Sequence, residues 1–194
     1  MTTTQEQSAD RAAPCDGLLD RCKEVLPDKV AHTIFWPIAI LGLLFDLWTK
    51  QAVFAALQDT PDQRLSIIDG LLTFQMALND GAAFGIASGK QVLLVGVSAI
   101  ALVVILGVFL FGAARQRLVQ VALGLFTAGV CGNLWDRLFN EGRVRDFIDV
   151  VYWPGKHWHT FNVADAMLCI AVGLLVVTTL LTDSSCQKHD PPQK

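Results

Sequence analysis

The chain has 194 residues, of which 53% are hydrophobic and 17% charged, and its mean hydropathy is +0.45. Ordinary soluble domains carry about 25% charged residues and about 45–50% apolar residues even when glycine is counted. This composition therefore excludes an ordinary soluble domain and favours one small membrane domain. The formal net charge of −3 argues neither for nucleic-acid binding nor for a basic patch on a membrane surface.

Residues 1–32 form a polar tail that we expect to be cytoplasmic. Charges of both signs alternate there among Thr, Gln, Ala and Pro, a composition typical of disorder or loose docking, although a short helix at 16–26 also fits. The tail has no apolar stretch, so we expect no cleavable signal peptide. A membrane domain at 33–182 and a short polar tail at 183–194 complete the predicted organisation.

Four apolar runs follow the tail, each near the length of about 20 residues that crosses a bilayer as a helix. They cover residues 34–57, 92–114, 118–138 and 163–181. The third run carries Gly124, Ala128 and Gly132 at intervals of four, a pattern typical of close helix packing in membranes. Four spans predict an antiparallel bundle that has both chain ends on one side and the two long connections on the other.

The connection between the first and second runs, residues 58–90, is too long for a plain loop. Its apolar stretches at 65–68 and 71–78 flank Asp69-Gly70, a dipeptide typical of a tight hairpin turn. The second stretch alternates apolar and polar side chains, as a strand with one buried face does. We therefore predict a small β-sheet at the membrane surface.

Polar side chains interrupt the apolar runs near one end of the predicted bundle. Asp46 and Lys50 lie one helical turn apart, either as a neutralising pair or as a brace for a polar site. Asn133, Asp136 and Arg137 share one face of the third run because they are three and four residues apart. Three polar groups directed the same way on a membrane helix favour a functional role.

The connection at 142–165 carries three carboxylates, namely Asp146, Asp149 and Asp165. Asp165 begins the fourth run, and an ionisable group in a membrane costs roughly 2–4 kcal/mol at the bilayer centre and less near the interface. Such a residue needs a partner, water or a function. We predict that Asp146 and Asp165 face each other and do chemistry together. Asp149 has no evident partner, and its replacement by Asn should leave substantial activity.

The number of basic residues does not fix the orientation in the membrane, since eight Lys and Arg lie on the side of the termini and seven on the side of the polar clusters. The short connection with Arg115 and Arg117 is of the kind that follows the positive-inside rule. We therefore expect both termini to be cytoplasmic. Tyr152, Trp153 and Trp158 suit an interfacial belt or a flap that lies on the membrane.

Five short motifs resemble those of bacterial lipoprotein signal peptidase, signal peptidase II, and they extend over about residues 34–181. The motifs are Asp46-Leu47-Trp48-Thr49-Lys50, Asn79-Asp80-Gly81-Ala82-Ala83-Phe84, Gly132-Asn133-Leu134-Trp135-Asp136-Arg137, Val144-Arg145-Asp146-Phe147-Ile148-Asp149 and Phe161-Asn162-Val163-Ala164-Asp165. Each motif alone is weak, but five in order at suitable spacings are highly specific.

The resemblance implies an all-α membrane protein, namely a four-transmembrane-helix antiparallel bundle with a small extracytoplasmic β-sheet cradle and a loop or helix flap. It implies an aspartic endopeptidase of the bacterial cytoplasmic (inner) membrane whose active site lies on the extracytoplasmic face. The expected substrate is a prolipoprotein carrying a diacylglyceryl cysteine, cut just before that cysteine. Membrane lipid is the other expected partner. We expect a monomer with no nucleic acid, no cofactor and no metal.

The same resemblance assigns roles to individual residues. Asp146 and Asp165 match the two catalytic aspartates. The residues matched to substrate binding or support of this pair are Asn79, Gly81, Asn133, Arg137 and Asn162. The residues matched to structural support are Asp46, Lys50 and Asp136. Two close carboxylates cannot both ionise readily, so one can activate water while the other, protonated, donates to the scissile carbonyl.

Two other functions fit parts of the sequence. A proton-coupled transporter would use Asp46, Asp136 and Asp165 as a relay, but the opposite halves of the apolar runs are uncharged, whereas a relay would continue through them. A metal-dependent hydrolase would use His157 and His159 with the carboxylates, but His-x-His in a loop is a weak signature. No Ser/His or Cys/His pair falls on the polar face, which gives a covalent mechanism no support.

Overall fold

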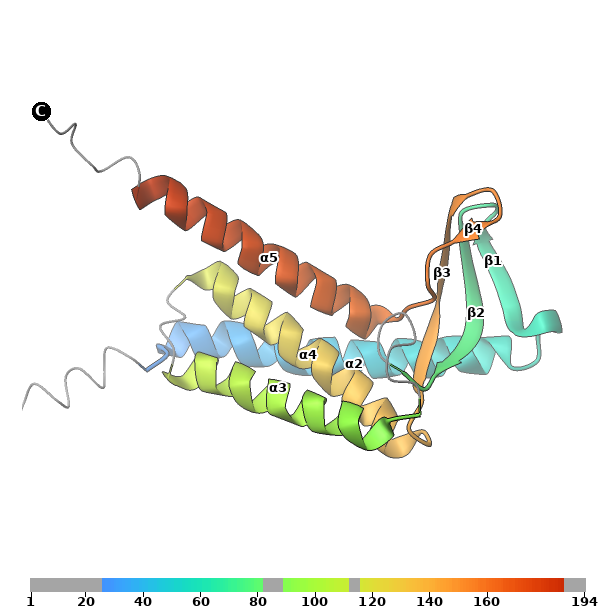
Figure 1. Ribbon diagram of the computed structural model, residues 1–194, viewed down its shortest axis with the longest axis horizontal. Helices are drawn as coiled ribbons and strands as arrows, with labels where there is room; N and C mark the ends of the chain where they lie inside the picture. The colour runs from blue at the N-terminus through green and yellow to red at the C-terminus, as the bar shows by residue number, and fades with distance from the viewer. Residues whose placement is uncertain (1–25, 82–88, 112–115, 187–194) are drawn as a thin grey trace, which may run out of the picture.

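The computed structural model describes residues 26–81, 89–111 and 116–186 of the chain (Figure 1). Within these residues, four helices are long and apolar enough to cross a membrane. They are α2 (Lys29–Leu57), α3 (Gln91–Phe111), α4 (Arg117–Phe139) and α5 (Val163–Cys186). The predicted helix at 16–26 lies outside the described residues except for Leu26, which is not helical. The four predicted spans are confirmed.

The first helix begins earlier than predicted because a side chain caps it. The carboxylate Oδ1 of Asp28 accepts a hydrogen bond of 2.8 Å from the backbone N–H of Ala31, one of the N–H groups that the first helical turn leaves unpaired. Arg117 at the start of α4 donates to the same carboxylate, at 2.9 Å from Oδ2. The starts of α2 and α4 are therefore joined at the end of the bundle that carries the termini.

Helix α4 is the centre of the bundle and packs against the other three helices (Figure 1). Half of its most apolar stretch is buried, against 11% for α3, which therefore presents most of its surface to the surroundings. Small residues let the neighbouring helices approach α4 closely, as the sequence predicted. A Cβ atom on Gly124 would lie 3.1 Å from the carbonyl oxygen of Phe35 on α2.

A four-stranded antiparallel sheet lies at the end of the bundle opposite the termini (Figure 1). Its strands, in the order β1-β2-β3-β4, are β1 (Arg64–Ile68), β2 (Leu72–Asn79), β3 (Val144–Trp153) and β4 (Lys156–His157). A short 3₁₀ turn, η1 (Pro61–Gln63), leads from α2 into β1. The predicted hairpin is confirmed, and Gly70 at its turn has φ +72°, a conformation that glycine adopts without strain.

The segment between α4 and α5, where a loop or helix flap is expected, carries strands β3 and β4, which extend the predicted sheet. Its β-branched and aromatic residues, from Val144 to Trp153, suit a strand that pairs with β2 along its length. The register shifts between the pairs Phe74–Ile148 and Ala77–Asp146, so two residues of β2 oppose one residue of β3. The extra residue of this β-bulge lies in β2, so the bulge changes which side chains of β2 share a face.

We predict that Gly129→Ala destabilises the protein by about 1–3 kcal/mol, the usual cost of overpacking a close contact. A Cβ at this position would lie 2.7 Å from the carbonyl oxygen of Ala164 and 2.7 Å from Cγ of Leu168, so α5 would have to move. Gly107→Ala on α3 is the matched control, because a Cβ there meets nothing within 4 Å. Thermal unfolding in the same detergent should separate the two variants, and equal unfolding temperatures would contradict this packing.

Candidate active site

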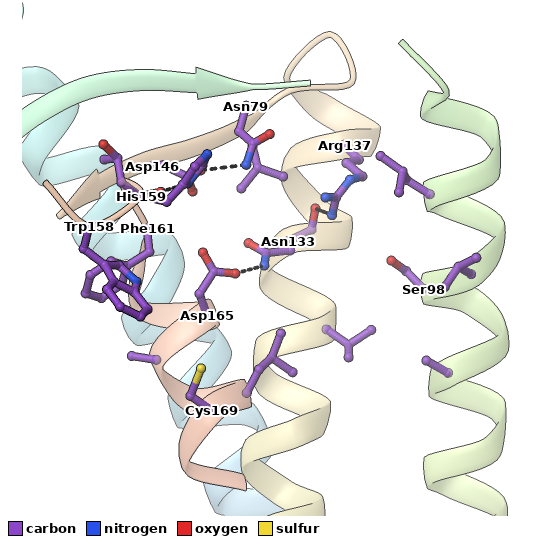
Figure 2. Close-up of a pocket in the computed structure, with 18 residues that line it drawn as sticks. Asn79, Ser98, Asn133, Arg137, Asp146, Trp158, His159, Phe161, Asp165 and Cys169 are labelled. Atoms are coloured by element: carbon purple, nitrogen blue, oxygen red, sulfur yellow. Dashed lines mark hydrogen bonds between the residues drawn. The ribbon is translucent and has the colours of Figure 1, made fainter. Parts of the chain in front are cut away.

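Polar side chains from β2, β3, α4 and α5 converge where the sheet meets the bundle (Figure 2). The residues are Asn79 on β2, Asn133 and Arg137 on α4, Asp146 on β3, Asn162 just before α5, and Asp165 in its first turn. Asp146 and Asp165 both line one cavity of about 620 Å³. The structure therefore brings the two aspartates and four of their five predicted partners together, as the antiparallel topology required.

The position of Asp165 is fixed by the start of its own helix. The backbone N–H of Asn162 donates to Asp165 Oδ2 at 3.2 Å, and the backbone N–H of Asp165 donates to Asn162 Oδ1 at 3.0 Å. This reciprocal pair is a capping box, and the positive end of the helix dipole favours the carboxylate there. The other oxygen, Oδ1, accepts a hydrogen bond of 2.8 Å from Asn133 Nδ2.

Asp146 is 1% exposed and is held by two amides. Asn79 Nδ2 donates to its Oδ2 at 3.0 Å, and Asn162 Nδ2 donates to its Oδ1 at 2.6 Å. Burial raises the pKa of Asp146 to about 6, and the negative charge of Asp165 adds to this increase, while the two amide hydrogen bonds and the charge of Lys50 oppose it. Asp146 is therefore a carboxyl group that changes protonation near neutral pH.

The buried ammonium group of Lys50 holds one of these side chains, the amide of Asn133, in place. Lys50 Nζ lies 2.8 Å from Asp46 Oδ2 and 3.2 Å from Asp136 Oδ2, and it donates to Asn133 Oδ1 at 3.2 Å. Lys50 and both carboxylates are fully buried. Because Asn133 Oδ1 accepts from Lys50 and also from Asn162 Nδ2 at 3.1 Å, its amide nitrogen must face Asp165. The ion network thus orients a direct partner of Asp165.

The two carboxylates of this network also fasten the elements that carry the aspartates. Asp46 Oδ1 accepts from the backbone N–H of Ala164 at 2.8 Å, which joins α2 to the start of α5. Asp136 accepts from the backbone and guanidinium of Arg145, at 3.0 Å and 2.7 Å, which joins α4 to β3. A Cβ on Gly132 would overlap Asp46 Oδ2, so only glycine leaves room for this arrangement.

Arg137 lines the cavity, and two of its three guanidinium nitrogens are hydrogen-bonded to backbone carbonyl oxygens. Its Nη2 donates to the carbonyl oxygen of Gly81 at 2.9 Å, and its Nη1 donates to that of Asn133 at 3.3 Å. Gly81 in turn donates its backbone N–H to Asn79 Oδ1 at 2.9 Å, which fixes the amide bonded to Asp146. Nε of Arg137 is buried and has no hydrogen-bond partner among the described residues.

The cavity below the two aspartates has mostly apolar walls. Figure 2 shows it between α3 on one side and α4 and α5 on the other, with Asn79, Asp146 and Asp165 near its upper end. Its apolar lining includes Leu94, Val97, Ala101, Val130, Leu168 and Phe161. Ser98 and Cys169 also line it. This arrangement can hold an apolar chain next to two carboxyl groups.

The prediction that Asp149 lacks a partner is wrong. Asp149 is 1% exposed, and its Oδ2 lies 3.2 Å from Arg64 Nη2 on β1 and 2.9 Å from His157 Nδ1 on β4. Arg64 comes close to Asp149 because β1 pairs with β2 and β2 pairs with β3. This is a long-range contact, which no local sequence pattern predicts. The other histidine proposed as a metal ligand, His159, has its Nδ1 2.9 Å from the carbonyl oxygen of Thr160.

Sequence reasoning also missed two residues that position the site. Arg145 stands beside Asp146 and binds Asp136, and Gln91 Nε2 donates to the carbonyl oxygen of Arg137 at 3.0 Å. The place of Arg145 in a motif was the only signal that could have indicated its role. A basic residue next to a predicted site is equally typical of a solvent-exposed surface position. Gln91 gave no signal, because its role depends on the approach of α3 to the end of α4.

Comparisons with known proteins found one family model and several similar sequences that cover most of this chain. Residues 38–181 match the model of a protein family described as Signal peptidase (SPase) II. The lipoprotein signal peptidase of Geobacter sulfurreducens is 38% identical over 154 residues, which are 77% of this chain and 92% of that protein. The lipoprotein signal peptidase of Geobacter metallireducens is 34% identical over 165 residues, which are 84% of this chain and 99% of that protein.

A solved structure is similar to the whole described bundle. It is described as a bacterial membrane enzyme structure obtained by the in meso method at 2.3 Å resolution. The two chains superpose with a TM-score of 0.68 at 33% sequence identity, over 80% of this chain and 92% of the other. The residues that match the family model, 38–181, include every residue of the site.

We predict that the stability of the protein falls as Asp146 ionises. Its pKa is about 6 in the folded protein against an ordinary value of 3.8, so the folded state retains a proton that the unfolded chain loses between these values. The stabilisation is complete below about pH 4 and is lost as the pH rises through about 6, by up to about 3 kcal/mol.

The variant Asp146→Asn lacks this ionisation, and its altered amide hydrogen bonds shift stability by an amount that does not vary with pH. The difference in unfolding temperature between wild type and variant should therefore change between pH 4 and pH 7, to the disadvantage of the wild type at higher pH. A difference that stays constant over this range would contradict the raised pKa.

Proposed function

Because this chain belongs to the signal peptidase II family, we propose that it is a membrane aspartyl endopeptidase that cuts prolipoproteins just before a diacylglyceryl-modified cysteine. The protein is a peptidase that removes signal peptides from lipoproteins. The observation that carries the aspartyl mechanism is that Asp146 and Asp165 line one cavity and are both hydrogen-bonded to Asn162. The comparisons give no support to a proton-coupled transporter.

The chemistry follows from the unequal surroundings of the two carboxyls. Asp165 accepts one hydrogen bond from the side-chain amide of Asn133 and one from the backbone N–H of Asn162 at the start of its helix. Asp146 is buried, and its raised pKa favours the protonated form at a slightly acidic pH. An ionised carboxylate removes a proton from water while the protonated partner donates its proton to the oxygen of the scissile carbonyl. The carboxyl that gained the proton of water then protonates the leaving amine, and its partner recovers a proton from a hydroxyl of the tetrahedral intermediate as the C–N bond breaks. The two groups titrate as a pair.

Substrate binding uses the apolar cavity and its polar rim. The signal peptide and the diacylglyceryl chains are apolar, and the cavity walls from α3, α4 and α5 offer them matching surface. We assign to Arg137 and to the amides of Asn79 and Asn133 the task of holding the substrate backbone near the dyad. Arg137 lines the cavity beside both aspartates, and its guanidinium is a donor that suits a substrate carbonyl oxygen.

The proposed location is the bacterial cytoplasmic membrane, with both termini inside and the site on the extracytoplasmic face. The short connection carrying Arg115 and Arg117 supports this orientation through the positive-inside rule. Tyr152 and Trp153, at the end of β3, are more than half exposed, as interfacial aromatic residues are. We propose a monomer, because all the residues assigned to the site belong to one chain.

We predict that Asp146→Asn and Asp165→Asn each remove nearly all turnover of a lipidated precursor. Asn keeps the shape of Asp but can neither ionise nor pass on a proton. The double variant should lose about as much as either single variant, because residues that act as one unit are not additive. Asp69→Asn, at the exposed β1–β2 turn, is the matched control and should keep wild-type turnover. A folded Asp146→Asn or Asp165→Asn enzyme with near-normal turnover would exclude the dyad.

We also predict that cleavage requires the diacylglyceryl group. The lipid chains anchor the peptide in the bilayer and in the apolar cavity, so their loss removes binding energy that positions the scissile bond. The measurement compares kcat/KM for lipidated and unlipidated forms of one precursor, each in the same membrane mimetic. Equal rates for the two forms would contradict the assignment of the cavity.

A further inference from the structure

A second cavity, of about 650 Å³, lies over the sheet on the other side of Asp146. Unlike the first, it is lined largely by polar side chains. These include Arg64, Gln75, Asp80, Asp149, His157 and Thr160. The two cavities share Asn79, Asp146, Trp158, His159 and Thr160, so they meet at the site of the proposed chemistry. A chain that passes Asp146 can therefore lie partly in each.

The two halves of the proposed substrate differ in the same way as the two cavities. The signal peptide before the scissile bond is apolar and stays in the bilayer, whereas the exported chain after the lipidated cysteine is polar. The first cavity is walled by membrane helices, and the second is built on the sheet beyond the ends of the helices. Burial of a polar chain among helices is costly, so the exported residues belong in the second cavity.

Hydrogen bonds connect the segments that line this second cavity to one another. His157 Nδ1 lies 2.9 Å from Asp149 Oδ2, and the backbone N–H of Trp158 donates to the carbonyl oxygen of Val150 at 2.7 Å. Gln75 Nε2 donates to Thr160 Oγ1 at 2.6 Å, which joins the segment after β4 to β2. The cavity therefore exists before any ligand binds.

The charges that line this cavity are unbalanced. Asp80, Asp146 and Asp149 contribute three carboxylates, and Arg64 is the single arginine or lysine among the described lining residues. Arg64 is engaged with Asp149 at 3.2 Å, so their charges offset each other. The remaining potential is negative whenever Asp80 and one member of the dyad are ionised, and it repels a further negative charge.

We propose that this sheet-side cavity binds the first residues after the lipidated cysteine and selects against acidic side chains there, with Asp80 and the dyad supplying its negative charge and the paired Arg64 and Asp149 balancing each other. The inference rests on the proposed function, since it concerns the same substrate. It adds a specificity site for the exported part of the chain, separate from the apolar cavity for the signal peptide and lipid.

The experiment uses two lipidated precursors that differ only in having Lys or Glu at the second and third positions after the cysteine. The wild type should cleave the Lys precursor with a kcat/KM about three- to tenfold higher at low ionic strength, the size expected of partly screened charge interactions. The ratio should fall towards one in high salt, because salt screens charges across a solvated cavity.

Two variants of opposite sign separate charge selection from a structural role. Asp149→Asn removes a negative charge and should lower the Lys/Glu ratio, whereas Arg64→Gln removes a positive charge and should raise it. Loss of wall structure would instead lower kcat/KM for both precursors alike and leave their ratio unchanged. Asp69→Asn is the control, because Asp69 is on the same sheet but does not line the cavity, and its ratio should equal that of the wild type.

Equal kcat/KM values for the two precursors in the wild type would overturn this inference while leaving the proposed function intact. A ratio that moves in the same direction in Asp149→Asn and Arg64→Gln would also overturn it. Failure of the wild type to cut either precursor would overturn the proposed function, and the specificity site with it.

Discussion

The arrangement of the site depends on one buried ammonium group, that of Lys50. Burying a charge costs several kcal/mol unless it is paired and hydrogen-bonded, and Lys50 meets this condition with Asp46, Asp136 and the amide of Asn133. Through Asp46 the network reaches the first turn of α5, and through Asp136 it reaches β3. The two aspartates of the dyad stand on those two elements, so a single ion cluster on α2 and α4 sets their relative position.

Much of the fold could be predicted because its signals are local. Each apolar run determines its own helix, and Asp69-Gly70 determines a hairpin turn between two strand-like stretches. Antiparallel topology then brings the polar residues to one end without any knowledge of contacts. Asp146 and Asp165 were identified from these two facts and from motif resemblance, and the structure places both at the same cavity.

The remaining features depend on long-range register, which local patterns do not encode. Side chains alternate along a regular strand, so Asp146 and Asp149 would lie on opposite faces of β3, yet both line the sheet-side cavity. Between them β3 is irregular, because the backbone N–H groups of Phe147 and Ile148 both donate to the carbonyl oxygen of Phe161. The partner of Asp149 is Arg64, 85 positions away in the chain. The early start of α2 depends on the cap at Asp28, which apolar periodicity cannot reveal.

Asp146 and Asp165 should act as one unit with a single proton between them, and the pH dependence of kcat/KM for a lipidated precursor tests this most directly, since it reports ionisation of the free enzyme. We predict a bell-shaped profile. Activity falls at low pH when both carboxyls are protonated, and it falls again at or above about pH 6, the pKa of Asp146, as both become ionised. A profile that rises once and stays flat to about pH 9 would contradict a shared proton.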